Sequence, residues 1–232
     1  VARAWNGGKG FKKKQTNLRA VMAFIDIGDA FLVRKDSSIR SVGDLKGKRL
    51  GVSSPSSRRP MEAFLKAHGI MPGSYSVRYL SYTEQSNGLR DKNIAAGYMV
   101  VHRINRTAME FTSTVGGRII GFSSGAAVKS FEAASPVWRS VTLKAGTYSG
   151  QPKAVIVAGR HGLVHAHKDT SPDVIYKAVK TLFANHDQLK KIHPAAAMIS
   201  LAQTKRYYAN KLFVIPFHEG TKRYLKEVGV LK

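Results

Sequence analysis

The sequence has 232 residues, 43% of them hydrophobic, which is enough for one large domain or two small lobes with packed cores. Cysteine is absent, which excludes disulfide frameworks, thiolate metal sites and cysteine nucleophiles. No apolar run approaches the roughly 18 residues that a membrane span requires, and Val1–Lys9 lacks the apolar region of a signal peptide. We expect a chain that starts on valine to be a processed or incomplete product, so the lack of a signal says little about export. The absence of cysteine leaves both the cytosol and the periplasm open.

The formal net charge of +24 arises from 38 Lys and Arg against 14 Asp and Glu. Such a charge makes nucleic acid or an anionic membrane surface a partner to consider. Apart from Lys12–Lys14, however, the basic residues are single or paired along the whole chain, and no zinc finger or aromatic RNP strand is present. We therefore expect no specific nucleic-acid partner, only salt-sensitive binding to polyanions.

Strand and helix patterns alternate in the first half of the chain. Short β-rich runs predict strands at Ala30–Arg34, Lys48–Ser54, Ser76–Tyr82 and Ile94–Val101. Between them, the apolar spacing of Pro60–His68 predicts a helix, and Thr83 is a suitable N-cap for a second helix over residues 83–90. This alternation indicates βαβ units and a mainly parallel sheet.

The second half begins with strand-like segments at Gly116–Phe122 and Ala154–His165, and turn formers at Gly146–Pro152 predict a loop between them. Ser171–Asp173 opens the clearest helix, with a cap residue, a proline at the first helical position and an acidic first turn. Further helical runs are predicted from His193 and from Tyr224.

The polar turn after the strand at Lys48–Ser54 is the most informative segment. Ser53–Ser57 supplies hydroxyls and open backbone N–H groups ahead of a helix, where the helix dipole favours an anion, and Arg58 and Arg59 add forked cations. This combination predicts a site for a carboxylate or phosphate. The alternative is an ordinary strand-to-helix connection with a serine cap.

Seven segments in order resemble the TAXI family, the extracytoplasmic solute receptors of TRAP transporters. They are Asn17–Val21, Phe31–Ile39, Asp44–Arg49, Tyr79–Tyr82, Ala145–Gln151, His193–Ala196 and Ile215–Gly220. The resemblance implies an α/β type II periplasmic binding protein fold, in which two lobes close around a ligand in a cleft. It also implies a periplasmic location and a monomer that presents a small organic anion to a TRAP membrane permease.

Against this family, the chain has no counterpart of an N-terminal strand and a loop with glycine and tyrosine, so we expect that segment to be missing. The lobes are then expected at residues 1–35 with 160–232, incomplete at the N-terminus, and at residues 36–159. Pro55–Arg59 replaces the family's glycine-serine-glycine turn, and Ala95 stands where an acidic residue is expected. These differences leave the ligand open among dicarboxylates, keto acids and acidic amino acids.

Candidate ligand contacts follow from the polar turn and the resemblance. Ser56, Ser57 and Arg58 match the family's polar turn and are the first choice, with helix capping as the alternative. Asn6 lies in a segment that the family places near the cleft, although Asn-Gly pairs are also simple turn formers. Three aromatic residues are candidates to line the cleft, against core packing as the alternative, namely Tyr82, Tyr98 and Tyr148.

Metal binding and catalysis have little support. Among His161, His165 and His167 only the last two are two residues apart and could chelate jointly, so a metal site is not expected. Asp26 and Asp29 are the nearest approach to paired carboxylates, and their spacing in a loop before a strand favours turn and capping roles. No Gly-x-Ser-x-Gly elbow is present. We expect no cofactor and no catalytic residue, with a polyanion-binding protein or an enzyme on the same fold as alternatives.

Overall fold

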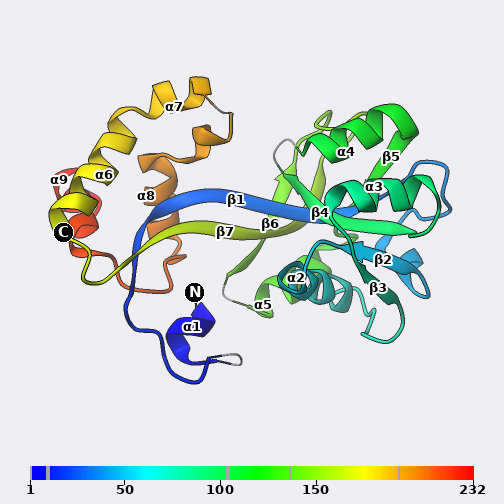
Figure 1. Ribbon diagram of the computed structural model, residues 1–232, viewed down its shortest axis with the longest axis horizontal. Coiled ribbons are helices and arrows are strands. Elements are labelled where there is room, and N and C mark those ends of the chain that lie inside the picture. Colours follow the sequence, from blue (N-terminus) through cyan, green and yellow to red (C-terminus); the bar gives the residue numbers. More distant parts are fainter. Residues whose placement is uncertain (1, 9–10, 103–104, 136, 193) are drawn as a thin grey trace. The chain divides into compact units, whose positions relative to one another are not determined.

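The computed structural model describes residues 2–8, 11–102, 105–135, 137–192 and 194–232 (Figure 1). The chain divides into two compact units, which are called unit 1 (residues 1–26 and 161–232) and unit 2 (residues 27–160). Two long strands, β1 (Leu18–Arg34) and β7 (Val155–His167), each continue through the boundary between the units. The lobes expected from the sequence had boundaries at 35/36 and 159/160. The compact units instead divide at 26/27 and 160/161, and β1 is one unbroken strand whose second half pairs with strands of unit 2.

Unit 2 is built on a mixed sheet with the strand order β3-β2-β4-β1-β7-β6, and β5 pairs with β1. Its other elements are β2 (Arg49–Val52), α2 (Pro55–Lys66), β3 (Ser76–Tyr79), α3 (Tyr82–Arg90), β4 (Ala96–His102), α4 (Arg106–Phe111), β5 (Gly117–Ile120), α5 (Gly125–Ala133) and β6 (Trp138–Leu143). Short 3₁₀ and π turns lie at Val42–Leu45 and Thr112–Gly116. β2 pairs in parallel with β3 and β4, whereas β1 is antiparallel to β4 and β5, and β6 is antiparallel to β7. The prediction of a mainly parallel sheet is therefore wrong outside β2, β3 and β4.

Helices cover both faces of this sheet (Figure 1). α2 and α5 contribute Phe64 and Phe131 to a core on one face, where Phe31 and Tyr98 meet at 5.0 Å between ring centroids. α3 and α4 cover the other face, where Leu89 packs with residues of β1 and β4. The residues named in both cores are buried. The apolar faces of the helices therefore hold the helices on the sheet.

Unit 1 combines the first half of β1 and the second half of β7 with helices. These are α1 (Ala2–Asn6), α6 (Pro172–Ala184), α7 (His186–Ile192), α8 (Leu201–Ala209) and α9 (Glu219–Glu227), with a 3₁₀ turn at Pro194–Met198. Its core joins Val21 of β1, Val179 of α6 and Leu225 of α9, all buried. A single parallel bridge links Ala20 to Phe217. No helix among the described residues is both long enough and apolar enough to span a bilayer.

Several element boundaries differ from the predictions. α2 starts at Pro55 with Ser54 as its N-cap, rather than at Pro60, and α3 is capped by Ser81, whose hydroxyl accepts from the Glu84 amide, rather than by Thr83. β3 ends at Tyr79, and Tyr82 is the first residue of α3 rather than the last residue of a strand.

In the second half, β6 was not predicted, and α9 begins at Glu219 rather than at Tyr224. His193, the predicted start of a helical run, lies outside the described residues. The helix that opens at Ser171–Asp173 is confirmed as α6.

Candidate functional site

The carboxyl ends of the parallel strands in unit 2 meet at one edge of the sheet. β2 leads there into Ser53, and β4 ends at His102, which pairs with Gly28 of β1. β7 passes the same edge, since Gly159 lies beside the Ile27 carbonyl. Ligands of open α/β sheets bind outside this kind of edge. We call it the carboxyl edge.

The serine turn at this edge is largely occupied by capping. The Ser54 hydroxyl accepts a hydrogen bond from the Ser57 amide at 3.2 Å and lies 2.8 Å from the Ser56 hydroxyl. Ser53 Oγ donates to Ser57 Oγ at 3.0 Å. Ser56 is exposed and Ser57 is half-buried. The capping interpretation is thus correct for Ser54, while Ser56 and Ser57 stay open to solvent in the first turn of α2.

Arg58 follows in the same turn and is held by two neighbours. Its Nε donates to Glu62 Oε1 at 2.7 Å, and its Nη1 donates to the Tyr79 hydroxyl at 3.3 Å. The hydrogen bond to Tyr79 and then that to Glu62 raise the Arg58 pKa above its usual value. Two of its five N–H donors are engaged by described residues, so the guanidinium is oriented and still has donors for an anion.

Sequence reasoning missed a buried ion pair at this edge. Asp29 lies inside β1, so its assignment to a loop with a turn or capping role is wrong. Its side chain is 4% exposed and accepts a hydrogen bond from Arg160 Nη1 of β7. Burial raises the Asp29 pKa, while the charge and the hydrogen bond of Arg160 act in the opposite direction. The Arg160 side chain is 32% exposed, so it reaches solvent while it neutralises a buried carboxylate.

The three candidate tyrosines differ in accessibility. Tyr98 is 1% exposed, and burial, followed by the Asp29 charge, raises its pKa well above the usual value. Its buried hydroxyl has no hydrogen-bond partner among the described residues. Tyr148 is also in the core, donates to the Val101 carbonyl at 2.8 Å, and burial raises its pKa to about 12. Tyr82 is half-buried, and its hydroxyl accepts from the Val100 amide at 3.4 Å.

Of the seven candidate residues, Ser56, Ser57 and Arg58 lie together as three consecutive residues of α2. Tyr98 and Tyr148 belong to separate cores of unit 2, so core packing describes both. Asn6 is exposed at the end of α1 in unit 1.

A second polar cluster lies in unit 1 around Asp26, which also sits in β1 rather than in a loop. The carboxylate accepts from His161 Nδ1 at 2.7 Å, Arg206 Nη2 at 2.6 Å and Gln203 Nε2 at 3.2 Å, and from the buried Tyr207 hydroxyl. Burial acts to raise the Asp26 pKa, but these hydrogen bonds outweigh it and hold the pKa well below its usual range.

His161 belongs to this cluster. Its Nδ1 contacts both Asp26 and the Tyr207 hydroxyl, and its ring packs edge-on against the Tyr207 ring at 4.5 Å. His167 is half-exposed, 3.5 Å from Asp169. Across the ranges that the structure describes, no three His, Asp or Glu side chains converge as metal ligands.

Comparisons with known proteins agree with this architecture. Residues 1–229 match the model of the NMT1-like family. The periplasmic sulfonate-binding protein SsuA from Methylobacillus flagellatus KT superimposes with a TM-score of 0.52 at 13% identity, covering 92% of this chain and 70% of that one. SsuA from Escherichia coli gives a TM-score of 0.49 at 13% identity over 94% of this chain, which spans 60% of the length of that protein. The fold is therefore that of the periplasmic binding proteins.

Proposed function

Because the chain belongs to the NMT1-like family and has a periplasmic binding protein fold, we propose that it is a solute-binding receptor of a membrane transporter. The receptor works in the periplasm as a monomer, captures a small organic anion and delivers it to the permease. It catalyses no reaction. The observation that carries the proposal is the arrangement at the carboxyl edge, where Ser56, Ser57 and Arg58 form one solvent-facing turn at the N-terminus of α2.

The ligand class follows from the donors in this turn. Hydroxyls, first-turn amides and a guanidinium offer hydrogen bonds and positive charge, which suits a carboxylate better than a neutral solute. Arg160 adds a second half-exposed cation to the same edge. We propose that the ligand is a dicarboxylate, a keto acid or an acidic amino acid. Sulfonates are included in the test because two structures similar to this chain are named sulfonate-binding proteins. A TRAP permease as partner rests on the resemblance to the TAXI receptors.

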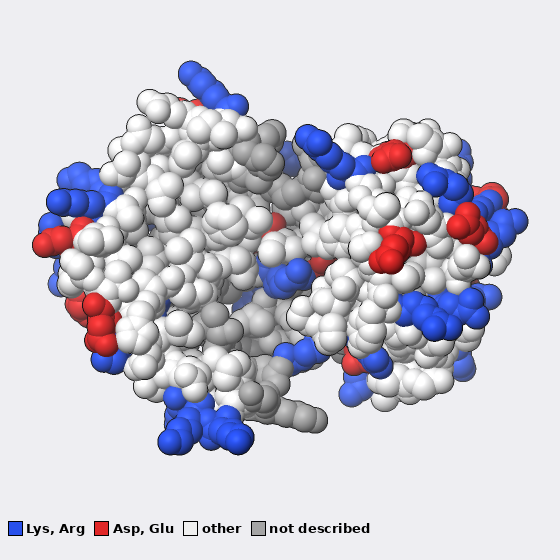
Figure 2. Space-filling view, in the orientation of Figure 1, with Lys and Arg blue, Asp and Glu red and all other residues white. Residues whose placement is uncertain are grey.

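The charge of +24 favours one other candidate, a polyanion-binding protein. On the face drawn in Figure 2, Lys and Arg are scattered over both units and acidic residues lie between them. A dedicated polyanion site gathers its cations into one large patch or stripe, whereas on this face they form small separate groups. We therefore retain a small anion as the proposed ligand, and binding to a polyanion is one of the outcomes that the test distinguishes.

A thermal-shift screen tests the function. Dicarboxylates, keto acids, acidic amino acids, alkanesulfonates and an oligonucleotide are compared at physiological salt. A ligand at 100 times its dissociation constant adds about 2.7 kcal/mol of stability. A selective shift with one small acid is expected. A shift with the oligonucleotide alone, lost at higher salt, would contradict the proposal, and turnover of the bound acid would assign an enzyme instead.

The matched variants are Arg58→Ala and Arg59→Ala. Arg58→Ala removes a guanidinium that is held at the site, so we expect the dissociation constant to rise about ten- to hundredfold. Arg59 is the next residue of α2, is exposed and makes no ion pair within the described residues, so its loss is expected to leave binding unchanged. Equal effects of the two substitutions would mean that affinity comes from diffuse charge, and the site assignment would be wrong.

A further inference from the structure

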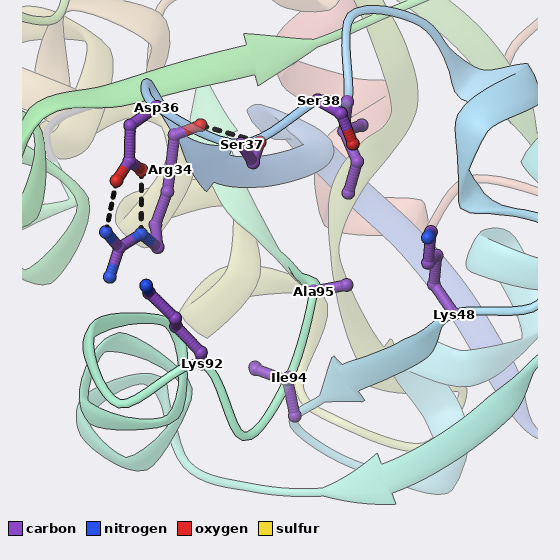
Figure 3. Close-up of a pocket in the computed structure, with 9 residues that line it drawn as sticks. Arg34, Asp36, Ser37, Ser38, Lys48, Lys92, Ile94 and Ala95 are labelled. Carbon is purple, nitrogen blue, oxygen red and sulfur yellow. Dashed lines mark hydrogen bonds and ion pairs between the residues drawn. The ribbon is translucent and has the colours of Figure 1, made fainter.

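Unit 2 has a pocket of about 440 Å³ at the sheet edge opposite the serine turn. Its walls come from the end of β1 at Arg34, from Lys48 just before β2 and from Ala95 just before β4 (Figure 3). We call it the amino-edge pocket. Its volume lies in the range of small-molecule sites.

The pocket carries more positive than negative charge. Three cationic side chains, Arg34, Lys48 and Lys92, line it together with one carboxylate, Asp36. That carboxylate is already occupied, because Arg34 Nε donates to Asp36 Oδ1 at 2.8 Å and Arg34 Nη2 donates to the other oxygen. Arg34 Nη1 also donates to the Arg90 carbonyl at 2.8 Å, so the guanidinium is fixed in place. The net charge of the lining groups is three minus one, or +2.

The two lysines are not neutralised. The hydrogen bond from Arg34 is the main cause that lowers the Asp36 pKa, and the charge of Lys92 adds to it, yet neither Lys92 nor Lys48 forms an ion pair within the described residues. Figure 3 shows Lys92 on the side of the Arg34–Asp36 pair and Lys48 on the opposite side, with Ala95 between them. Like charges around one hollow repel each other unless an anion lies between them.

The backbone of Lys92 is also unusual. Its φ of 62° lies in the left-handed region, which is costly for a residue with a side chain. Lys92 N donates to the Leu89 carbonyl, and Ile94 N donates to the Gly88 carbonyl at 3.1 Å, so the turn after α3 is fixed. Glycine is the usual residue at such a helix end. A lysine there gains some attraction from the helix dipole, but its position also directs a charge toward the pocket.

The inner wall is apolar and the rim is polar. Ile39 and Ile94 line the pocket and are 3% and 4% exposed, whereas the Ser38 hydroxyl at the rim is exposed. An apolar wall suits the short carbon skeleton of an organic acid, and the cationic side chains suit the oxygens of a carboxylate or a phosphate.

We propose that the amino-edge pocket is a second anion site, which binds a small oxyanion, a phosphate or a carboxylate, between Lys48 and Lys92 beside the Arg34–Asp36 pair. It lies at the edge opposite the serine turn and is independent of it. An anion there neutralises the like charges and ties the end of α3 to the start of β2.

Titrations of the ¹⁵N-labelled chain with inorganic phosphate and, separately, with citrate test the site. We expect saturable shifts at the backbone amides of Lys92, Ile94 and Ala95 with at least one of the two anions. The anion that gives the tighter binding distinguishes a phosphate site from a carboxylate site. No saturable shift at these amides with either anion would overturn the proposal, and this result needs no variant.

Lys48→Gln/Lys92→Gln is expected to weaken binding at least tenfold, since it removes two charged donors. The matched control, Lys129→Gln/Lys177→Gln, removes the same net charge from exposed lysines of α5 and α6 and is expected to bind like the parent. Equal weakening in both double variants would assign the effect to overall charge and overturn the site. The Arg58→Ala variant is expected to keep the amino-edge response, which separates this site from the transport ligand.

Discussion

Asp26→Asn is the substitution with the clearest expected effect on unit 1. The change keeps the size of the side chain but replaces one acceptor oxygen by an NH₂ group and removes the charge. Among the donors to Asp26, the Tyr207 hydroxyl is buried and the His161 side chain is only 10% exposed, so neither turns readily to water. Arg206 is half-exposed at 52% and is free to do so.

The magnitude follows from these two donors. A hydrogen bond to a charged acceptor contributes about 1.5–3 kcal/mol, and breaking a buried charged network costs about 3–5 kcal/mol. The half-exposed Arg206 adds under about 1 kcal/mol. A loss of about 3–5 kcal/mol lowers the melting temperature of a chain of this size by roughly 6–20 °C.

The assay is thermal and urea unfolding from pH 7 to pH 2. The folded pKa of Asp26 lies below its ordinary value of 3.8, so its contribution to stability is present above that pH and is lost as the pH falls through the folded pKa. The gap between the parent and Asp26→Asn is therefore expected to narrow below about pH 4. The control is Asp187→Asn, because Asp187 pairs with Lys190 on the surface with its side chain 86% exposed. A parent-like melting temperature for Asp26→Asn, or a gap that persists unchanged to pH 2, would refute the reasoning.

Two further substitutions test the packing and the backbone. A Cβ on Gly220 would lie 2.2 Å from the Pro172 carbonyl and 2.8 Å from the Tyr176 amide, so Gly220→Ala is expected to cost about 1–3 kcal/mol in urea unfolding, whereas Gly125→Ala meets nothing within 4 Å and is expected to cost nothing. Lys92→Gly removes the cost of a side chain at a left-handed φ, so it is expected to raise the free energy of unfolding by about 1 kcal/mol. A free energy of unfolding below that of the parent would show that the lysine side chain stabilises this turn.

Short-range signals in the sequence, such as a cap residue or a proline, predict where some elements begin. The cap residue, the proline and the acidic residue at Ser171–Asp173 are sufficient to start α6. The same kind of signal misplaces the start of α2, because Pro60 also matches the pattern of a first helical residue. Pro55 already holds that position, and Pro60 lies within the helix. Either proline is suited to the first helical position, and the neighbouring residues do not show which of the two occupies it.

In the candidate site, too, features formed by neighbouring residues were predictable, and contacts between distant residues were not. The serine turn could be found because capping hydroxyls, the helix start and Arg58 are consecutive. The networks around Asp26 and Asp29 could not, since His161 is 135 residues from Asp26, Tyr207 is 181 residues from it, and Arg160 is 131 residues from Asp29. The sequence around a single carboxylate in an apolar strand does not indicate which distant side chains it contacts in the fold. The strand β6 was missed for a related reason, because its identity depends on pairing with β7.

The path of β1 and β7 through both units sets an order of assembly during synthesis. Unit 2 is one continuous stretch, residues 27–160, so it can fold once Arg160 has left the ribosome. The core of unit 1 joins the first half of β1 to residues of α9, so it is complete only after Glu219–Glu227 has been synthesised. Until then Val21, which is buried in the folded chain, has no core to pack into, and an unpaired apolar strand of this kind favours aggregation.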